Sequence, residues 1–265
     1  MILDKIVSKT TERITNLKKE IPLDDLKNEA LSLEITNDFI FEKNLKKEGM
    51  SFISEIKKAS PSKGDIVSDD QFNYIEIAKD YEKAGASAIS ILTEPYFFKG
   101  NNDYIREVSK TVSLPLLRKD FVVDEYMIYE AKVIGASAVL LICSILDEET
   151  LKNYIKLADS LGLSALVEAH DEDEVKMALN AGARIIGVNN RNLKNFVVDF
   201  NNAINLRKIV PKDIIFVSES GVKTKEDIDL LKSHDVDAVL IGESLMKSDN
   251  KAQMIDYLDG KLDNL

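Results

Sequence analysis

A carboxylate and a lysine interrupt an apolar run near residue 55, where the chain reads Phe52-Ile53-Ser54-Glu55-Ile56-Lys57. Side chains two residues apart in a strand lie on the same face, so Glu55 and Lys57 point one way and Ile56 points the other. Two interpretations are open for these residues taken alone. They form either a solvated ion pair at a rim or a charge pair that faces a substrate.

Two further apolar runs end in residues suited to proton transfer. Lys119 shares a strand face with Leu117, so it points inward if that leucine does, and Arg118 then points outward. Glu168 closes a later run. A lysine that is partly desolvated near carboxylates can protonate an oxygen as a general acid, and a carboxylate opposite it completes an acid/base pair. Each residue taken singly could also be a solvated strand end.

Groups that could hold hydroxyls and anions follow three more apolar runs. Asn189 could hydrogen-bond a hydroxyl and Arg191 could bind an anionic group, with an asparagine-rich turn as the alternative. Bare backbone amides at Gly221 and Gly242 could approach a phosphate. A glycine after both runs favours phosphate binding over two ordinary turns. The carboxylate of Glu243 suits such a site only if it points away from the anion.

All these residues belong to one repeated pattern of apolar runs and amphipathic, helix-period stretches. Helical stretches that close in Gly85, Gly135 and Gly182 lead directly into the next run, as is typical of a helix stop before a strand. The pattern predicts an α/β protein of the closed (β/α)8 TIM-barrel type, with its active site at the C-terminal ends of the strands. No G-x-G-x-x-G follows the first run, which disfavours an open dinucleotide-binding sheet. The expected strands are 52–56, 88–92, 114–117, 138–142, 164–167, 185–188, 214–217 and 238–241.

Residues 1–49 do not fit the repeat. Segments 3–18 and 23–33 have helical spacing and much charge, so we expect an N-terminal helical extension packed on the barrel. No linker rich in Pro, Gly or Ser separates it from the repeats at 50–265. The sequence therefore predicts a single domain over residues 1–265.

Composition limits the possible partners. The net charge of −11 disfavours binding to nucleic acid or to an anionic membrane, so any basic cluster must be local. No apolar run is long enough to span a bilayer, and the N-terminus lacks the uninterrupted apolar stretch of a secretory signal. We therefore expect a cytoplasmic protein.

The single cysteine and the two histidines give little support for metal or disulfide chemistry. Cys143 cannot form an internal disulfide and is expected to pack in the core. His170 precedes an acidic stretch and is expected to mark a helix start, rather than to take part in catalysis. His234 lies far from it in the sequence. No metal site is expected.

Taken together, the strand-end motifs closely resemble those of the indole-3-glycerol-phosphate synthase family. They occur in the family's order over nearly the whole chain, with small departures at Ser54, Ala169 and Val222 that touch no assigned role. The matching segments are 54–64 (SEIKKASPSKG), 92–94 (LTE), 97–100 (FFKG), 117–121 (LRKDF), 166–168 (LVE), 189–193 (NNRNL), 218–221 (SESG) and 241–246 (IGESLM).

The resemblance implies a carboxy-lyase of tryptophan biosynthesis that needs no cofactor. It would convert 1-(2-carboxyphenylamino)-1-deoxyribulose 5-phosphate into indole-3-glycerol phosphate, CO2 and water, and other enzymes of the pathway are possible partners. By motif position, Lys119 matches the general acid at the ketone oxygen, and Glu168 matches the general base of the dehydration. Glu55 and Lys57 match the pair that holds the substrate and supports proton transfer. Which lysine donates at which step stays open.

The resemblance also implies the substrate contacts. Asn189 would hold the reacting hydroxyl, Arg191 would lie near the anthranilate carboxylate, and Glu219 would reach the sugar hydroxyls. Pro61 and Phe121 would line the slot for the aromatic ring. The phosphate and its neighbouring groups would be surrounded by Ser60, Ser220, Gly221, Gly242 and Glu243.

Two alternatives explain fewer of these residues. An isomerase barrel that makes this substrate would leave the set of Glu55, Lys57 and Lys119 unexplained. A barrel that binds phosphosugars without catalysis could keep its glycines while losing Lys119 or Glu168, and both are present.

Overall fold

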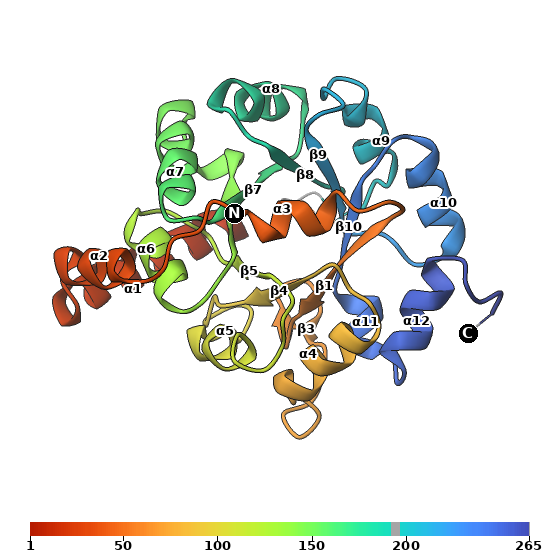
Figure 1. The fold of residues 1–265 in the computed structure, drawn as a ribbon, viewed down its shortest axis with the longest axis horizontal. Helices are drawn as coiled ribbons and strands as arrows, with labels where there is room; N and C mark the ends of the chain where they lie inside the picture. The colour runs from red at the N-terminus through yellow and green to blue at the C-terminus, as the bar shows by residue number, and fades with distance from the viewer. Residues whose placement is uncertain (192–196, 265) are drawn as a thin grey trace.

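Eight parallel strands close into a barrel in the computed structural model, which describes residues 1–191 and 197–264 (Figure 1). Each strand pairs with its neighbours in chain order, and β1 closes the ring against β10. This confirms the predicted TIM barrel. The strands are β1 (Ser51–Ile56), β4 (Ala88–Leu92), β5 (Leu116–Lys119), β6 (Ala138–Ile142), β7 (Ser164–Ala169), β8 (Ile185–Asn189), β9 (Ile215–Glu219) and β10 (Ala238–Ile241).

Helices surround the barrel, and alternation along each strand separates two apolar layers. On β1, Ile53 packs inside the barrel with Leu117 and Leu166, whereas Ile56 packs outside against Ile77 of α4 and its neighbours, as predicted. No helix in the described ranges is both long and apolar enough to cross a membrane. The helices after β1 are α4 (Tyr74–Lys83), α5 (Asn102–Val108), α6 (Tyr126–Val133), η1 (Cys143–Ile145), α7 (Glu148–Ser160), α8 (Glu172–Ala181), α9 (Asn201–Arg207), α10 (Lys225–Ser233), α11 (Glu243–Lys247) and α12 (Lys251–Leu258).

Three helices precede the barrel: α1 (Ile2–Glu20), α2 (Leu23–Ser32) and α3 (Ile40–Leu45). The first two lie where the sequence predicts helices, and α3 was not predicted. Phe41 and Leu45 of α3 are buried in the inner apolar layer of the barrel. Because α3 also contacts the beginnings of β1 and β4, it closes the N-terminal end of the barrel, and Figure 1 shows it crossing the centre of the view.

The predicted bounds of the third strand were wrong on the side of the site. The third strand was expected at 114–117 but runs from Leu116 to Lys119, because Pro115 has no N–H to donate to a neighbouring strand. After β1 the chain forms a small antiparallel hairpin of β2 (Ala59–Ser60) and β3 (Gly64–Asp65), with a turn at residues 61–63.

A buried ion pair ties α1 to the barrel directly beside Lys119. Arg13 donates to both carboxylate oxygens of Asp120, at 3.0 and 2.8 Å, and the side chain of Asp120 is fully buried. Asp120 also accepts from Thr93 at 2.8 Å, and the Arg118 guanidinium lies 3.6 Å away. Arg118 points out toward α6, as predicted, where it donates to the carbonyl of Met127.

Arg13→Ala should therefore lower the free energy of unfolding by about 3 kcal/mol, the lower end of the cost of breaking a buried pair, because Arg118 still compensates Asp120 in part. Urea denaturation followed by far-UV circular dichroism measures this loss. Lys9→Ala is the matched control, since Lys9 pairs with Glu12 in solvent on the same helix and should leave the transition midpoint unchanged. Equal effects of the two substitutions would contradict the assignment.

Candidate active site

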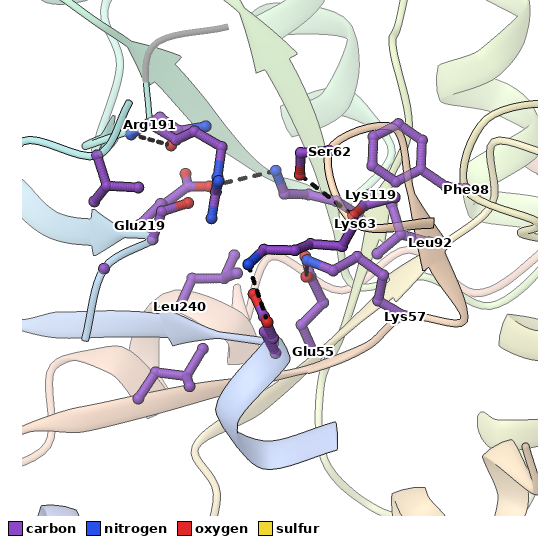
Figure 2. A pocket seen from close by; sticks show the side chains of 18 of the residues that line it. Glu55, Lys57, Ser62, Lys63, Leu92, Phe98, Lys119, Arg191, Glu219 and Leu240 are labelled. Atoms are coloured by element: carbon purple, nitrogen blue, oxygen red, sulfur yellow. Dashed lines mark hydrogen bonds and ion pairs between the residues drawn. The ribbon is translucent and has the colours of Figure 1, made fainter. Parts of the chain in front are cut away.

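A cavity of about 850 Å³ opens at the C-terminal ends of the strands. Every site residue named from the sequence lines it, and Figure 2 shows Glu55, Lys57, Lys119, Arg191 and Glu219 around the same space. The set brought together is Glu55, Lys57, Ser60, Pro61, Lys119, Phe121, Glu168, Asn189, Arg191, Glu219, Ser220, Gly221, Gly242 and Glu243.

The ammonium of Lys119 lies between two carboxylates that come from other strands of the barrel. Its Nζ is 3.2 Å from Oε2 of Glu168 on β7 and 3.3 Å from Oε2 of Glu219 on β9. The Lys119 side chain is 14% exposed and the two glutamates are almost fully buried. Lys119 is therefore an inward-facing residue of the site rather than a solvated strand end.

Burial and charge shift the three groups in different directions. Burial alone would lower the pKa of Lys119, but the charges of Glu219, Glu168 and Glu55 outweigh it and raise that pKa. Burial opposes ionisation of Glu168, yet Lys119 and His170 keep its pKa below the usual value. Burial and the neighbouring Glu168 raise the pKa of Glu219 to about 7, against the pull of Lys119. Glu168 is thus held ionised, whereas Glu219 binds a proton more readily.

The pair Glu55–Lys57 is buried rather than solvated. Lys57 Nζ donates to Oε1 of Glu55, and the Glu55 side chain is only 4% exposed. This excludes the rim interpretation. The carboxylate occupies space that a side chain at residue 242 would need, because a Cβ built on Gly242 would collide with it. Gly242 therefore leaves room for the carboxylate of Glu55, a role that the sequence did not reveal.

A second glycine makes room for Glu219. Gly187 lies on β8, and a Cβ built there would collide with Oε1 of Glu219 and crowd Leu166. That same oxygen is buried and has no hydrogen-bond partner among the described residues. Sequence analysis missed Gly187. A glycine inside an apolar strand indicates that another group packs closely against the backbone, but the sequence does not identify that group.

Asn189 is fixed at the end of β8 by two hydrogen bonds. Its amide nitrogen donates to Oε1 of Glu168 at 3.4 Å, and its amide oxygen accepts the backbone N–H of Arg191 at 3.0 Å. The last two residues of the resemblance segment 189–193 lie outside the described residues. Asn189 therefore links the carboxylate of Glu168 to the start of the following loop.

The expected phosphate end lies after β9 and β10. Ser220 and Gly221 both have positive φ, 65° and 98°, so the chain turns sharply there. The Glu243 carboxylate accepts a hydrogen bond from Nζ of Lys247 at 2.8 Å. It also lies 3.6 Å from Nζ of Lys63, in the β2–β3 hairpin. Its charge is thus directed to two lysines, which removes the objection that it would repel an anion.

An apolar slot adjoins the charged groups. Phe121 lies 5.9 Å from Phe98 between ring centroids, and Pro61 also lines the cavity. The sequence did not assign Phe98, which is held by a buried carboxylate: Glu94 accepts the backbone N–H groups of residues 96–98 at 2.7 to 3.1 Å. Ile2, Leu3 and Ile6 of α1 line the cavity too, so the N-terminal helix contributes to the site.

Cys143 is buried and burial raises the pKa of its thiol to about 12, in line with the predicted core role. Among the described residues, no group of three metal-ligating side chains comes together.

A closed (β/α)8 barrel with a buried lysine among carboxylates at its strand ends belongs to the TIM-barrel class and has a site suited to general acid/base catalysis. A family model described as indole-3-glycerol phosphate synthase matches residues 3–258, and the chain belongs to this family. Its activity is indole-3-glycerol phosphate synthase activity, a carboxy-lyase step in tryptophan biosynthesis. This decides between the alternatives left by the sequence.

Curated relatives agree over almost the full length. The chain is 58% identical to the indole-3-glycerol phosphate synthase of Ruminiclostridium cellulolyticum over 260 residues, covering 98% of this chain and 99% of the relative. It is 56% identical to that of Endomicrobium trichonymphae over 255 residues, covering 96% and 98%.

Solved structures with low identity share the fold alone. The 3-hexulose-6-phosphate synthase of Salmonella typhimurium matches with a TM-score of 0.64 at 13% identity, covering 80% of this chain and 97% of that chain. A structure of the tryptophan synthase complex from Pyrococcus furiosus matches with a TM-score of 0.57 at 14% identity, covering 79% and 97%.

Gly187→Ala should destabilise the protein by about 1–3 kcal/mol, because the added methyl overpacks against the Glu219 carboxylate. Urea denaturation of the single variants and the double variant with Glu219→Asp gives the coupling between the two positions. The shorter aspartate withdraws the colliding oxygen, so the glycine substitution should cost much less in that background. The same cost in both backgrounds would show that Glu219 is not what requires Gly187.

Proposed function

We propose that Lys119 is the general acid of ring closure and Glu168 the general base of the dehydration. The substrate would be 1-(2-carboxyphenylamino)-1-deoxyribulose 5-phosphate. The observation that supports this most directly is the buried Lys119 ammonium, in hydrogen-bond reach of Glu168 and at the edge of the apolar slot.

In the first step, the ring carbon that bears the carboxylate attacks the ketone carbon of the sugar chain. Negative charge develops on the ketone oxygen, and Lys119 transfers a proton to it. The carboxylate then leaves as CO2, and its bonding electrons restore the aromatic ring. Hydrophobic side chains around the slot favour this loss of charge, because an apolar surrounding disfavours a carboxylate.

In the second step, the new hydroxyl leaves as water. Glu168 takes the proton from the carbon next to the ring nitrogen, a lysine donates a proton to the departing hydroxyl, and the double bond of the indole forms. Asn189, which contacts Glu168, orients that hydroxyl. Glu55 and Lys57 hold the substrate and resupply protons, and either lysine can serve as the second acid.

The substrate's remaining groups match the rest of the cavity. Pro61 and Phe121, together with Phe98, would hold the aromatic ring, and Arg191 would pair with its carboxylate. Glu219 would accept sugar hydroxyls. The phosphate would bind to backbone N–H groups and hydroxyls contributed by Ser60, Ser220, Gly221, Gly242 and Glu243.

The protein is proposed to be a single-domain enzyme of the cytoplasm. It is proposed to work without cofactor or metal and to associate with other enzymes of the pathway. Burial of Phe41 and Leu45 inside the barrel supports one folding unit for residues 1–265. The pairing of Lys57 with Glu55, and of Lys119 with Glu168 and Glu219, supports chemistry by proton transfer.

Lys119→Met should reduce turnover by at least about 1,000-fold, in the upper range for the loss of a general acid, while substrate binding is largely kept. Stopped-time assays of indole fluorescence in chelator-treated buffer measure turnover, and equilibrium titration measures binding. Lys79→Met, an exposed lysine on α4, is the matched control and should have no effect. Retained turnover in Lys119→Met would reassign the general acid to Lys57, and the absence of turnover by the intact chain would refute the proposed reaction.

A further inference from the structure

His170 lies directly behind Glu168, outside the cavity lining, with its side chain 18% exposed. Its backbone is held on both sides: the N–H donates to Oε2 of Glu174 at 2.8 Å, and the carbonyl accepts from Asn202 at 3.0 Å. Asp171, the next residue, caps α8 by accepting the N–H of Glu174. The backbone of His170 is therefore fixed between the end of β7 and the start of α8.

The contacts of the ring determine which nitrogen carries hydrogen. Nδ1 lies 3.1 Å from Oε2 of Glu174, and an ionised carboxylate can only accept, so Nδ1 is the donor. Nε2 faces Oε1 of Glu168 at 3.4 Å and, among the described residues, has no hydrogen-bond partner within normal distance. In a neutral ring, Nε2 would then turn a lone pair toward a carboxylate oxygen. A proton on Nε2 removes this repulsion and forms a charge pair.

The charges around the ring favour the imidazolium. Burial alone would lower the pKa of His170, but the hydrogen bond to Glu174 and the charges of Glu168, Glu174 and Glu219 outweigh it and raise the pKa. Lys119 contacts the other oxygen of Glu168. Cys143, whose Sγ contacts the carbonyl of Glu174, keeps its proton because burial raises its pKa to about 12.

We propose that His170 is a positioning residue for the reaction: its imidazolium, held by Glu174, fixes Oε1 of Glu168 and keeps this carboxylate ionised for proton abstraction. The inference rests on the proposed role of Glu168 as the general base. Oε1 is held by His170 and Asn189, and Oε2 is held by Lys119. The carboxylate of Glu168 is thus held by residues from β5, from β8 and from the end of β7.

The sign of the pH effect follows from these contacts. Below the raised pKa of His170 the imidazolium is present and lowers the pKa of Glu168, which extends activity to lower pH. Removing the imidazolium lets the pKa of Glu168 rise, so the acid limb of kcat/KM moves to higher pH. A nearby opposite charge typically shifts a carboxyl by about one unit or more.

His170→Asn tests this, with the pH profile of kcat/KM as the readout. The acid limb should move up by about one pH unit, so the loss of activity is larger at pH 5.5 than at pH 8. His234→Asn, at the exposed end of α10, is the matched control and should leave the limb in place. A histidine needed only for folding would change stability but not the limb, and an unshifted limb in His170→Asn overturns the proposal.

Histidine NMR on the intact chain gives a second test that does not depend on that variant. The chain has two histidines, and His234→Asn assigns their signals. His170 should titrate above 6.5, and Glu168→Gln should lower its midpoint by removing the paired charge. A midpoint that is unchanged in Glu168→Gln contradicts the pairing. Full turnover by Glu168→Gln would instead refute the proposed base, and the NMR result would still report on the contact.

Discussion

The ammonium of Lys119, buried among carboxylates inside the barrel mouth, is the interaction on which the site depends. Lys119 Nζ lies 3.2 Å from the carboxylate of Glu168, and at an effective dielectric constant of about 20 their attraction is on the order of 5 kcal/mol. This is comparable to the several kcal/mol of hydration free energy that each ion loses on burial. A single pair would roughly break even. With Glu219 added at 3.3 Å, attraction exceeds the cost, which explains why the pKa of Lys119 rises despite burial.

The same arithmetic leaves the carboxylates in excess. Lys119 cannot compensate both Glu168 and Glu219, so the one with additional cationic contact, Glu168, stays ionised and the other binds its proton more tightly. Their different pKa values are therefore a consequence of unequal partners around one lysine. The barrel supplies this inequality by placing the residues on β5, β7 and β9, whose inward faces converge without being adjacent in the sheet.

Packing such a cluster requires space that apolar strands do not normally leave. Gly187 and Gly242 provide it, since a Cβ at either position would occupy the volume of a glutamate side chain. At the opposite end, Phe41 and Leu45 of α3 fill the barrel with apolar side chains and exclude water from below the cluster. The apolar side chains below the cluster thus strengthen the charge interactions above them, because water there would raise the effective dielectric constant.

Sequence patterns predicted whatever depends on alternation along a strand. The inward face of Glu55 and Lys57 and the outward face of Arg118 follow from period two, and the barrel follows from the repeat of strand and helix. Features that depend on what lies across the barrel were not predictable in this way. The role of Gly187 appears only when β9 is beside β8, and the six residues of α3 are too few to give a periodic signal.

His170 stands two residues beyond Glu168, the spacing that joins Lys57 to Glu55, so both strand ends carry a carboxylate followed by a cationic group on the same face. At β1 the cation enters the cavity, whereas at β7 it lies behind the carboxylate, because α8 begins at once and Glu174 draws the imidazole outward. Spacing alone thus identifies the pair, and the element that follows the strand decides whether the cation meets the substrate or supports the group that does.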